Sequence, residues 1–171
     1  GPRYTSYPTA PHFDARFGEA DYRRQARASN DDPVPSPLSV YVHVPFCHSA
    51  CYYCGCTRII ARNPARGREY IERLAIEIDL QSKLFDRDRP LTQIHFGGGT
   101  PNFLGAEGIL AIMARLESAF SFDPEASREF SVELDPRHAD AQLVAEIAAA
   151  GINRISLGIQ DFDADVQKAI N

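Results

Sequence analysis

The sequence predicts an α/β fold, with a parallel sheet built from four consecutive strand–helix units. Short apolar segments alternate with longer segments whose apolar residues recur at helical spacing. Strands that alternate with helices imply right-handed βαβ units and a parallel sheet. Four units do not close an eight-stranded barrel, which takes about 250 residues, and the last helix reaches Asn171 without a stop signal. We therefore expect part of a TIM-type barrel, and a chain that is a fragment or one half of a larger barrel.

The units follow one another in a regular order. Strands are expected at residues 39–46, 91–96, 129–134 and 154–160, and helices at 70–85, 109–120, 143–150 and 164–170. Tyr70, Leu74 and Ile78 share one face of the first of these helices. Gly151 is placed to cap the third.

A separate N-terminal part precedes the first unit. A helix is expected at 14–28, and the segment DDPVPSP at 31–37 is a connector because proline blocks both helices and central strands. We therefore divide the chain into an extension at 1–37 and a core at 38–171.

Composition and charge exclude several classes of protein. The hydrophobic share of 44% and the charged share of 24% are those of an ordinary globular domain. The net charge of −5 argues against a nucleic-acid partner, whose binding surface would be basic. No apolar run approaches the length that spans a bilayer, so we expect no membrane segment. The start of the chain lacks the layout of a secretory signal.

The four cysteines are crowded into one short segment. Cys47, Cys51, Cys54 and Cys56 lie within ten residues of a chain of 171. A disulfide framework would spread its cysteines along the chain, and a chain of this size folds without such staples. The crowding therefore indicates a metal site in a reducing compartment, and we expect the protein in the cytoplasm.

Cys47, Cys51 and Cys54 follow the first predicted strand directly, with three and then two residues between them. Three thiolates on one loop can hold a corner of a [4Fe–4S] cubane, which leaves one iron open for another ligand. A zinc site is the alternative, but zinc sites usually pair two Cys-x-x-Cys units across a longer loop, and the sequence has no second unit.

In parallel sheets the chemistry gathers at the carboxyl ends of the strands. The four predicted strand ends carry PFCHSACYYCGC, GGGTP, ELDP and GIQDF. The glycine segment has neither the GxGxxG spacing nor a Walker lysine, so a phosphate loop is not expected. Glycines let a ligand approach the backbone closely, although a plain strand-to-helix turn is the alternative.

The cysteine spacing, with Tyr53 just before the third cysteine, resembles the radical S-adenosylmethionine (SAM) signature. Five segments together are similar to the oxygen-independent coproporphyrinogen III oxidases: PRYTSYPTA (2–10), YVHVPFCHSACYYCGC (41–56), HFGGGTP (95–101), VELDP (132–136) and SLGIQDF (156–162). These segments occur in the family's order and at similar spacing along the whole chain.

The resemblance implies a [4Fe–4S] cluster on Cys47, Cys51 and Cys54, two bound SAM molecules and a low-potential electron donor such as flavodoxin or ferredoxin. In this family, one-electron reduction cleaves SAM to a 5′-deoxyadenosyl radical. The radical takes a hydrogen from a propionate side chain, which loses CO₂ and becomes a vinyl group. Two such steps convert coproporphyrinogen III to protoporphyrinogen IX in anaerobic heme biosynthesis. The resemblance further implies a monomer.

The resemblance also implies roles for further residues. The first SAM would contact Tyr41, Gly98 and Glu133. The second would contact Gly99, Thr100 and Gln160. Tyr53 would offer a ring face to a SAM, and Cys56 would be a catalytic cysteine that is not a cluster ligand. The alternative for Cys56 is that a fourth cysteine ligates the cluster when SAM is absent. The N-terminal string at 2–10 would fold over the barrel mouth and touch the substrate.

Several alternatives stay open. Tyr41 could be a half-buried core residue, and Glu133 and Gln160 could be ordinary rim residues. Arg58, Arg62, Arg66 and Arg68 could pair with substrate carboxylates or an acidic donor, or could form a solvated helix start. His43 and His95 lack metal-ligand spacing and are expected to be hydrogen-bonded core or rim groups. A relative that binds heme without oxidising porphyrinogen shares the cluster motif, although Cys56 and the N-terminal string argue against it.

Overall fold

The computed structural model describes residues 12–125 and 127–170, so the string at 2–10 lies outside the described residues. The chain divides into two compact units, residues 1–35 and 36–171. The first contains helix α1 (Glu19–Asn30), which begins five residues later than predicted. The Gly18 amide donates to the Asp21 carboxylate at 3.0 Å, and this capping contact favours a helix start at residue 19.

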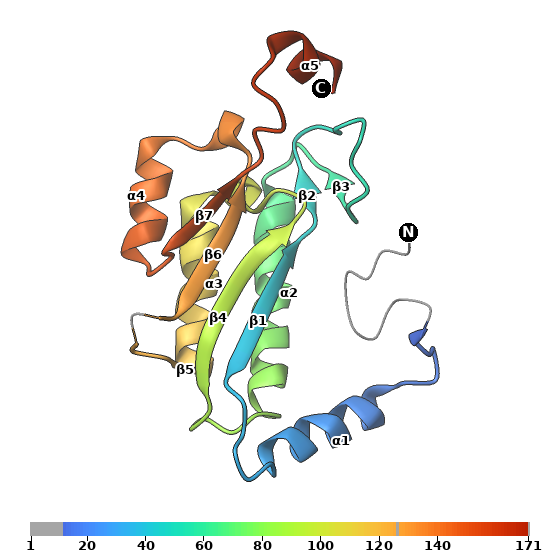
Figure 1. Cartoon of the computed structure of the whole chain (residues 1–171), viewed down its shortest axis with the longest axis vertical. Helices are drawn as coiled ribbons and strands as arrows, with labels where there is room; N and C mark the ends of the chain where they lie inside the picture. Colours follow the sequence, from blue (N-terminus) through green and yellow to red (C-terminus); the bar gives the residue numbers. More distant parts are fainter. Residues whose placement is uncertain (1–11, 126, 171) are drawn as a thin grey trace. The chain divides into compact units, whose positions relative to one another are not determined.

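The second unit is built on a parallel sheet with the strand order β1-β4-β6-β7 (Figure 1). Its strands are β1 (Leu38–Val44), β4 (Pro90–Gly98), β6 (Glu129–Leu134) and β7 (Arg154–Leu157). The short strand β5 (Ser121–Phe122) pairs with the start of β4. Every pairing is parallel, so the predicted α/β fold is confirmed.

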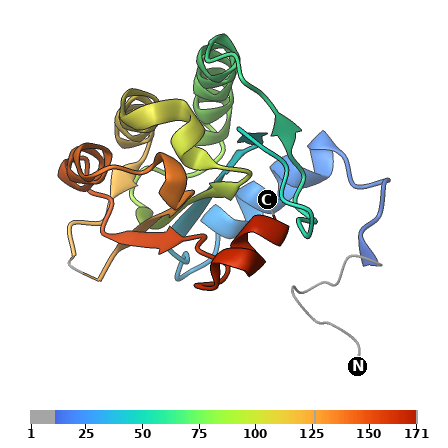
Figure 2. The ribbon, with the colours of Figure 1, turned by 90° about the horizontal axis from the view of Figure 1, so that it is seen from above.

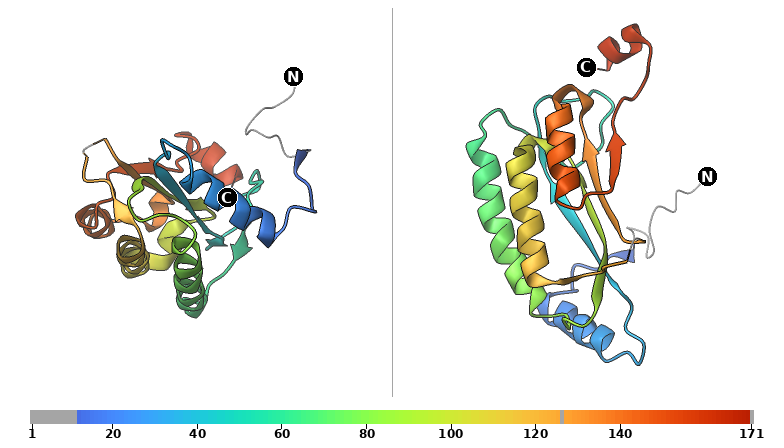
Figure 3. Two further views of the ribbon diagram at one scale, coloured as in Figure 1. Left: turned by 90° about the horizontal axis from the view of Figure 1, so that it is seen from below. Right: turned by 90° about the vertical axis from the view of Figure 1, so that its left-hand side faces the viewer.

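Helices α2 (Ala65–Ser82), α3 (Gly105–Ala119) and α4 (Ala141–Ala149) lie side by side along one face of the sheet (Figures 2 and 3). The core forms between them and the sheet. Phe96 on β4, Phe130 on β6 and Ile109 on α3 are all 0% exposed. Burying side chains of this size supplies most of the stabilisation of such a layer, at about 2 kcal/mol each.

Some element boundaries differ from the prediction. Helix α2 begins at Ala65 rather than residue 70, because Pro64 suits a helix start and the Asn63 side chain accepts from the Ala65 amide at 3.0 Å. Strand β7 ends at Leu157 rather than residue 160, because the chain turns directly after it: the Ile159 amide donates to the Leu157 carbonyl at 3.0 Å, and Gln160 has a φ of +68°. The last helix, α5 (Ala164–Ala169), lies close to its predicted position.

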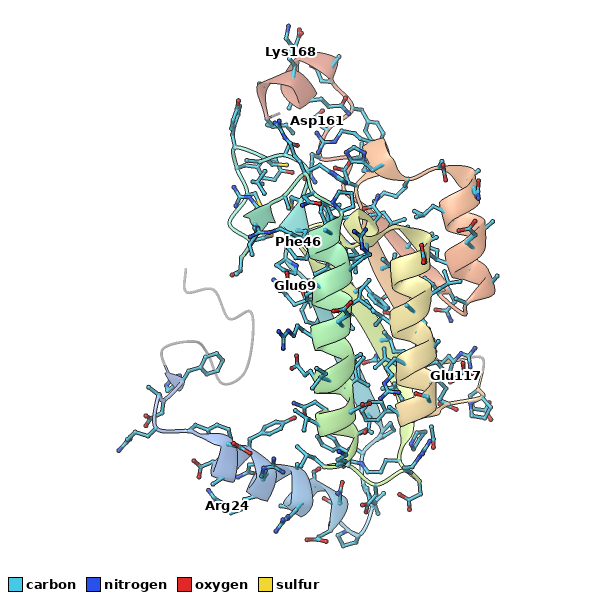
Figure 4. The ribbon with its side chains drawn as sticks, turned by 180° about the vertical axis from the view of Figure 1, so that it is seen from behind. Arg24, Phe46, Glu69, Glu117, Asp161 and Lys168 are labelled. Atoms are coloured by element: carbon cyan, nitrogen blue, oxygen red, sulfur yellow. The ribbon has the colours of Figure 1, made fainter. Side chains whose placement is uncertain are left out.

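Besides β5, four short elements were not predicted. They are β2 (Phe46–Cys47), β3 (Ile59–Ile60), and the 3₁₀ turns η2 (Pro101–Leu104) and η3 (Pro136–His138). Strands β2 and β3 pair with each other and close the base of the cysteine loop. Phe46 of β2 packs against Tyr70 and Phe103 at ring-centroid distances of 5.7 and 5.0 Å, near the first turns of α2 (Figure 4).

The opposite face of the sheet carries polar side chains, including Tyr41, His95 and Glu133. Their neighbours on each strand, such as Val42, Phe96 and Val132, point to the helices and are buried. This alternation follows from the two-residue period of a strand. Among the described residues, no helix is long and apolar enough to cross a membrane.

Candidate functional site

The loops after the four sheet strands surround one cavity of about 450 Å³. They lie at the end of the sheet where β2, β3 and α5 are drawn in Figure 1. All the site residues predicted from the sequence are among the described residues, and all except Tyr41 line this cavity. They are Cys47, Cys51, Tyr53, Cys54, Cys56, Gly98, Gly99, Thr100, Glu133 and Gln160.

Backbone hydrogen bonds hold the glycine segment against the residues that precede the first cysteine. The Gly99 amide donates to the Val44 carbonyl and the Thr100 amide to the Phe46 carbonyl, both at 2.7 Å. The Thr100 hydroxyl also contacts the Cys47 sulfur at 3.4 Å. A Cβ at Gly99 would lie 2.7 Å from the Phe46 carbonyl oxygen and 3.0 Å from this sulfur. Only glycine fits here, because the two segments approach too closely for a side chain.

The other cysteines lie farther along the same loop. The Cys56 amide donates to the Cys54 sulfur at 3.5 Å, and this hydrogen bond is the main reason why the pKa of the Cys54 thiol is lowered. The hydrogen bond with Cys54, followed by burial, raises the pKa of the Cys56 thiol. The Arg58 guanidinium donates to the Cys54 and Cys56 carbonyls at 3.0 and 3.5 Å and so fixes the end of the loop.

The donor set fits an iron–sulfur cluster. All four cysteines are free thiols, and thiolates are the protein ligands of such clusters. Among the described residues, no group of three or more His, Cys, Asp and Glu side chains is arranged to hold a single metal ion. A cubane takes its thiolates on different irons, so three thiols that line one cavity can serve as its ligands.

Gly98 and His43 connect the sheet to the end of the cysteine loop. Gly98 has φ +107°, and a Cβ there would lie 2.6 Å from Nδ1 of His43. Nε2 of His43 is 3.1 Å from the Thr57 carbonyl oxygen, so the imidazole donates to it. His43 is therefore the hydrogen-bonded rim group that the sequence predicted.

Tyr41 lies on the helix-free face of β1, beside Glu133 rather than in the cavity lining. It is 58% exposed, so the interpretation of Tyr41 as a half-buried core residue is wrong. Its hydroxyl and Oε2 of Glu133 would lie 3.0 and 3.2 Å from a Cβ at Gly97. Burial, followed by the negative charge of Glu133, raises the pKa of Tyr41.

The sequence reasoning did not identify the residues that follow ELDP. Arg137 lines the cavity and pairs with Asp135 at 2.7 Å. Partial burial alone would raise the pKa of Asp135, but hydrogen bonds from the Arg137 side chain and amide outweigh it and lower the pKa. The rings of His48 and His138 are 4.2 Å apart, and burial lowers the pKa of His48. The sequence signal that could have identified Arg137 and His138 is the charged triplet PRH (136–138), which follows the end of a predicted strand.

The four arginines after the cysteine loop do not share one role. Arg58 lines the cavity. Arg62, Arg66 and Arg68 are not among the described residues that line it, and they are exposed at or before the start of α2. For these three, the geometry favours the solvated helix start.

Comparison with known proteins finds a matching family model and similar proteins that match the chain over its full length. A family model described as the radical SAM superfamily matches residues 41–171. Over its full length, the chain is 42% identical to the oxygen-independent coproporphyrinogen III oxidase of Pseudomonas aeruginosa, and 43% identical to that of Escherichia coli. It covers 37% and 36% of these two relatives.

A solved structure gives the same result. It is that of the Escherichia coli coproporphyrinogen III oxidase (HemN), described as a radical SAM enzyme. It matches 98% of this chain with a TM-score of 0.88 and 40% identity, and the match covers 37% of the solved chain. The chain thus spans little more than a third of the length of the relatives it matches.

Proposed function

Because this chain belongs to the radical SAM superfamily, we propose that Cys47, Cys51 and Cys54 hold a [4Fe–4S] cluster at the cavity and that SAM binds beside it. Superfamily membership implies both groups. The observation that carries the assignment to these residues is that the three free thiols line the same cavity as the glycine segment. Thiolates are the protein ligands of iron–sulfur clusters. Glycines without side chains let a nucleoside ligand come close to the backbone beside the cluster.

We infer that two SAM molecules share the cavity. Tyr41, Gly98 and Glu133 would contact the first SAM, and Gly99, Thr100 and Gln160 the second. The Tyr53 ring, 53% exposed in the cavity wall, would offer its face to the adenine or the sulfonium. Glu133 would accept hydrogen bonds from hydroxyl or ammonium groups of the ligand.

We infer that the reaction is the oxidative decarboxylation of two propionate side chains of coproporphyrinogen III, which gives protoporphyrinogen IX. When bound, the cluster and SAM supply a carbon radical that removes a hydrogen from the propionate. The support for this substrate is the similarity to coproporphyrinogen III oxidases over the whole chain.

Cys56 is our candidate for a catalytic thiol. It lines the cavity and is exposed, unlike Cys47. As a thiol that is not assigned to the cluster, Cys56 can hold a proton on Sγ at the cavity wall. A low-potential flavodoxin or ferredoxin would supply the electrons. Four free thiols suit a reducing compartment such as the cytoplasm, where we expect the protein.

Anaerobic reconstitution tests the cluster. The wild-type protein should take up about four irons and four sulfides, and the electron paramagnetic resonance spectrum of the reduced cluster should change when SAM is added. Cys47→Ser, Cys51→Ser and Cys54→Ser should each lose most of this iron. Cys56→Ser is the matched control on the same loop and should keep it.

The proposed substrate is tested by an activity assay on the protein at its natural length. Incubated anaerobically with coproporphyrinogen III, SAM and a reductant, it should form protoporphyrinogen IX. SAM cleavage without vinyl product would instead favour a heme-binding relative. A protein purified with about one zinc and without iron or sulfide would contradict the cluster itself.

A further inference from the structure

Three polar side chains lie in one row across the helix-free face of the sheet. Tyr41 on β1, His95 on β4 and Ser131 on β6 are register partners on neighbouring strands. The Tyr41 and His95 rings stack with their centroids 5.6 Å apart and an interplanar angle of 18°. The imidazole is therefore held between two strands, and both of its nitrogens face side chains of β6.

Both ring nitrogens of His95 have a polar partner on β6. The Ser131 hydroxyl has one proton and donates it to the Ile94 carbonyl at 3.2 Å. The oxygen of the same hydroxyl lies 2.8 Å from Nδ1 of His95. Nε2 of His95 lies 3.3 Å from Oε1 of Glu133. A carboxylate oxygen can only accept, so Nε2 is the donor in this contact.

Three polar atoms from three strands converge above Gly97. A Cβ at Gly97 would lie 3.0 Å from Nε2 of His95, 3.0 Å from the Tyr41 hydroxyl and 3.2 Å from Oε2 of Glu133. The three polar atoms therefore crowd together over the backbone of Gly97. The side chains of His95 and Glu133 are 38% and 48% exposed, so a ligand on this face of the sheet can reach them. Oε1 of Glu133 contacts Nε2 of His95, whereas Oε2 lies over Gly97 beside the Tyr41 hydroxyl.

We propose that His95 is the positioning residue that holds Oε1 of Glu133, so that Oε2 and the Tyr41 hydroxyl are presented to the first SAM. This inference rests on the proposed function, in which Tyr41 and Glu133 contact that ligand. A carboxylate held at one oxygen loses less conformational freedom on binding, so the fixed contact raises affinity. His95 itself would touch Glu133 rather than the reacting atoms.

Two isosteric substitutions separate the two nitrogens of His95. In His95→Asn, the amide nitrogen can take the place of Nδ1 and keep the contact with Ser131, but nothing replaces Nε2. In His95→Gln, the amide nitrogen can take the place of Nε2 and donate to Glu133. We expect His95→Asn to bind SAM about tenfold more weakly than wild type, and His95→Gln to recover most of this loss.

The measurement is the dissociation constant for SAM, by equilibrium dialysis on anaerobically reconstituted protein of natural length. Iron content and thermal unfolding are recorded in parallel. Gln93→Ala is the matched control, because Gln93 lies two residues earlier on the same strand and contacts Ser39 instead of Glu133. It should bind SAM as wild type does.

Each outcome is decisive. Recovery by glutamine but not asparagine, at unchanged iron content, supports positioning through Nε2. Wild-type affinity in both variants overturns it, as does equal weakening in both with a lower unfolding temperature, since that marks a merely structural histidine. If wild type itself assembles no cluster or binds no SAM, the proposed function fails, and the inference fails with it because Glu133 then has no such ligand.

Discussion

At the scale of single residues, the backbone of Gln160 is unusual. Its φ of +68° lies in the left-handed region, which costs a residue with a Cβ about 1 kcal/mol. Gln160 follows β7 and lines the cavity. Such conformations concentrate at functional sites, where surrounding contacts hold them in place. The strain thus fits the proposed role of this side chain at the second SAM.

The backbone and side-chain contributions of Gln160 can be separated. Gln160→Gly and Gln160→Ala both remove the amide, but only glycine relieves the left-handed backbone. We expect Gln160→Gly to be more stable than Gln160→Ala by about 1 kcal/mol, measured by denaturant unfolding. Equal stability of the two variants would show that the residue is not held in this conformation in solution.

At the scale of elements, the 3₁₀ turn η2 joins the ends of two neighbouring strands. Its Asn102 is 6% exposed. The side-chain amide donates to the Asp135 and His138 carbonyls at 3.0 and 2.9 Å and accepts from the Asp135 amide at 3.1 Å. One buried side chain therefore fastens the turn after β4 to the loop after β6, and this holds Arg137 beside the cavity.

Removing this connection should be costly. Asn102→Ala leaves the Asp135 amide and the His138 carbonyl without this partner, whereas the Asp135 carbonyl keeps its hydrogen bond from the His138 amide. Each unsatisfied buried group costs about 1–3 kcal/mol, less where water enters. We expect a loss of about 3 kcal/mol in the free energy of unfolding. Gln142→Ala is the control, because the exposed Gln142 amide contacts only Glu146 in the next turn of α4; it should change stability by less than about 0.5 kcal/mol. A similar effect of both variants would contradict the role of Asn102.

At the scale of the whole second unit, helices cover one face of the sheet and Tyr70 ties the two layers at the site end. Its hydroxyl donates to the His43 carbonyl at 2.7 Å. Burial, followed by the negative charge of Glu77, raises the pKa of Tyr70 from 10.0 to about 12. The folded protein thus keeps this proton at a pH where the unfolded chain has lost it. The resulting stabilisation is complete below pH 10 and is lost as pH rises towards about 12.

Tyr70→Phe should therefore have an effect that depends on pH. Near neutral pH we expect the variant to be less stable by about 1 kcal/mol, because the hydrogen bond to His43 is lost. Between pH 10 and about 12 the difference should shrink, since only wild type loses stability through Tyr70. The other tyrosines are common to both proteins and cancel in the difference. Denaturant unfolding across this range measures it, and a constant difference would contradict the raised pKa.

The sequence by itself determined the order of strands and helices, because that order follows from local periodicity. It also placed the cysteines and the glycine segment at strand ends, and parallel strands bring their ends to one edge. The resemblance carried by five motifs pointed to the superfamily that the comparisons show. Boundaries were less certain, since the start of α2 and the end of β7 depend on Asn63 and on the backbone of Gln160.

Only the tertiary structure decided which side chains meet across the sheet. His95, Ser131 and Glu133 form one hydrogen-bonded group through strand register, and Asn102 reaches Asp135 across more than thirty residues of sequence. A period of two residues assigns a side chain to a face, but its neighbour on that face depends on register between strands. Such contacts join residues far apart in the chain, so no local pattern records them.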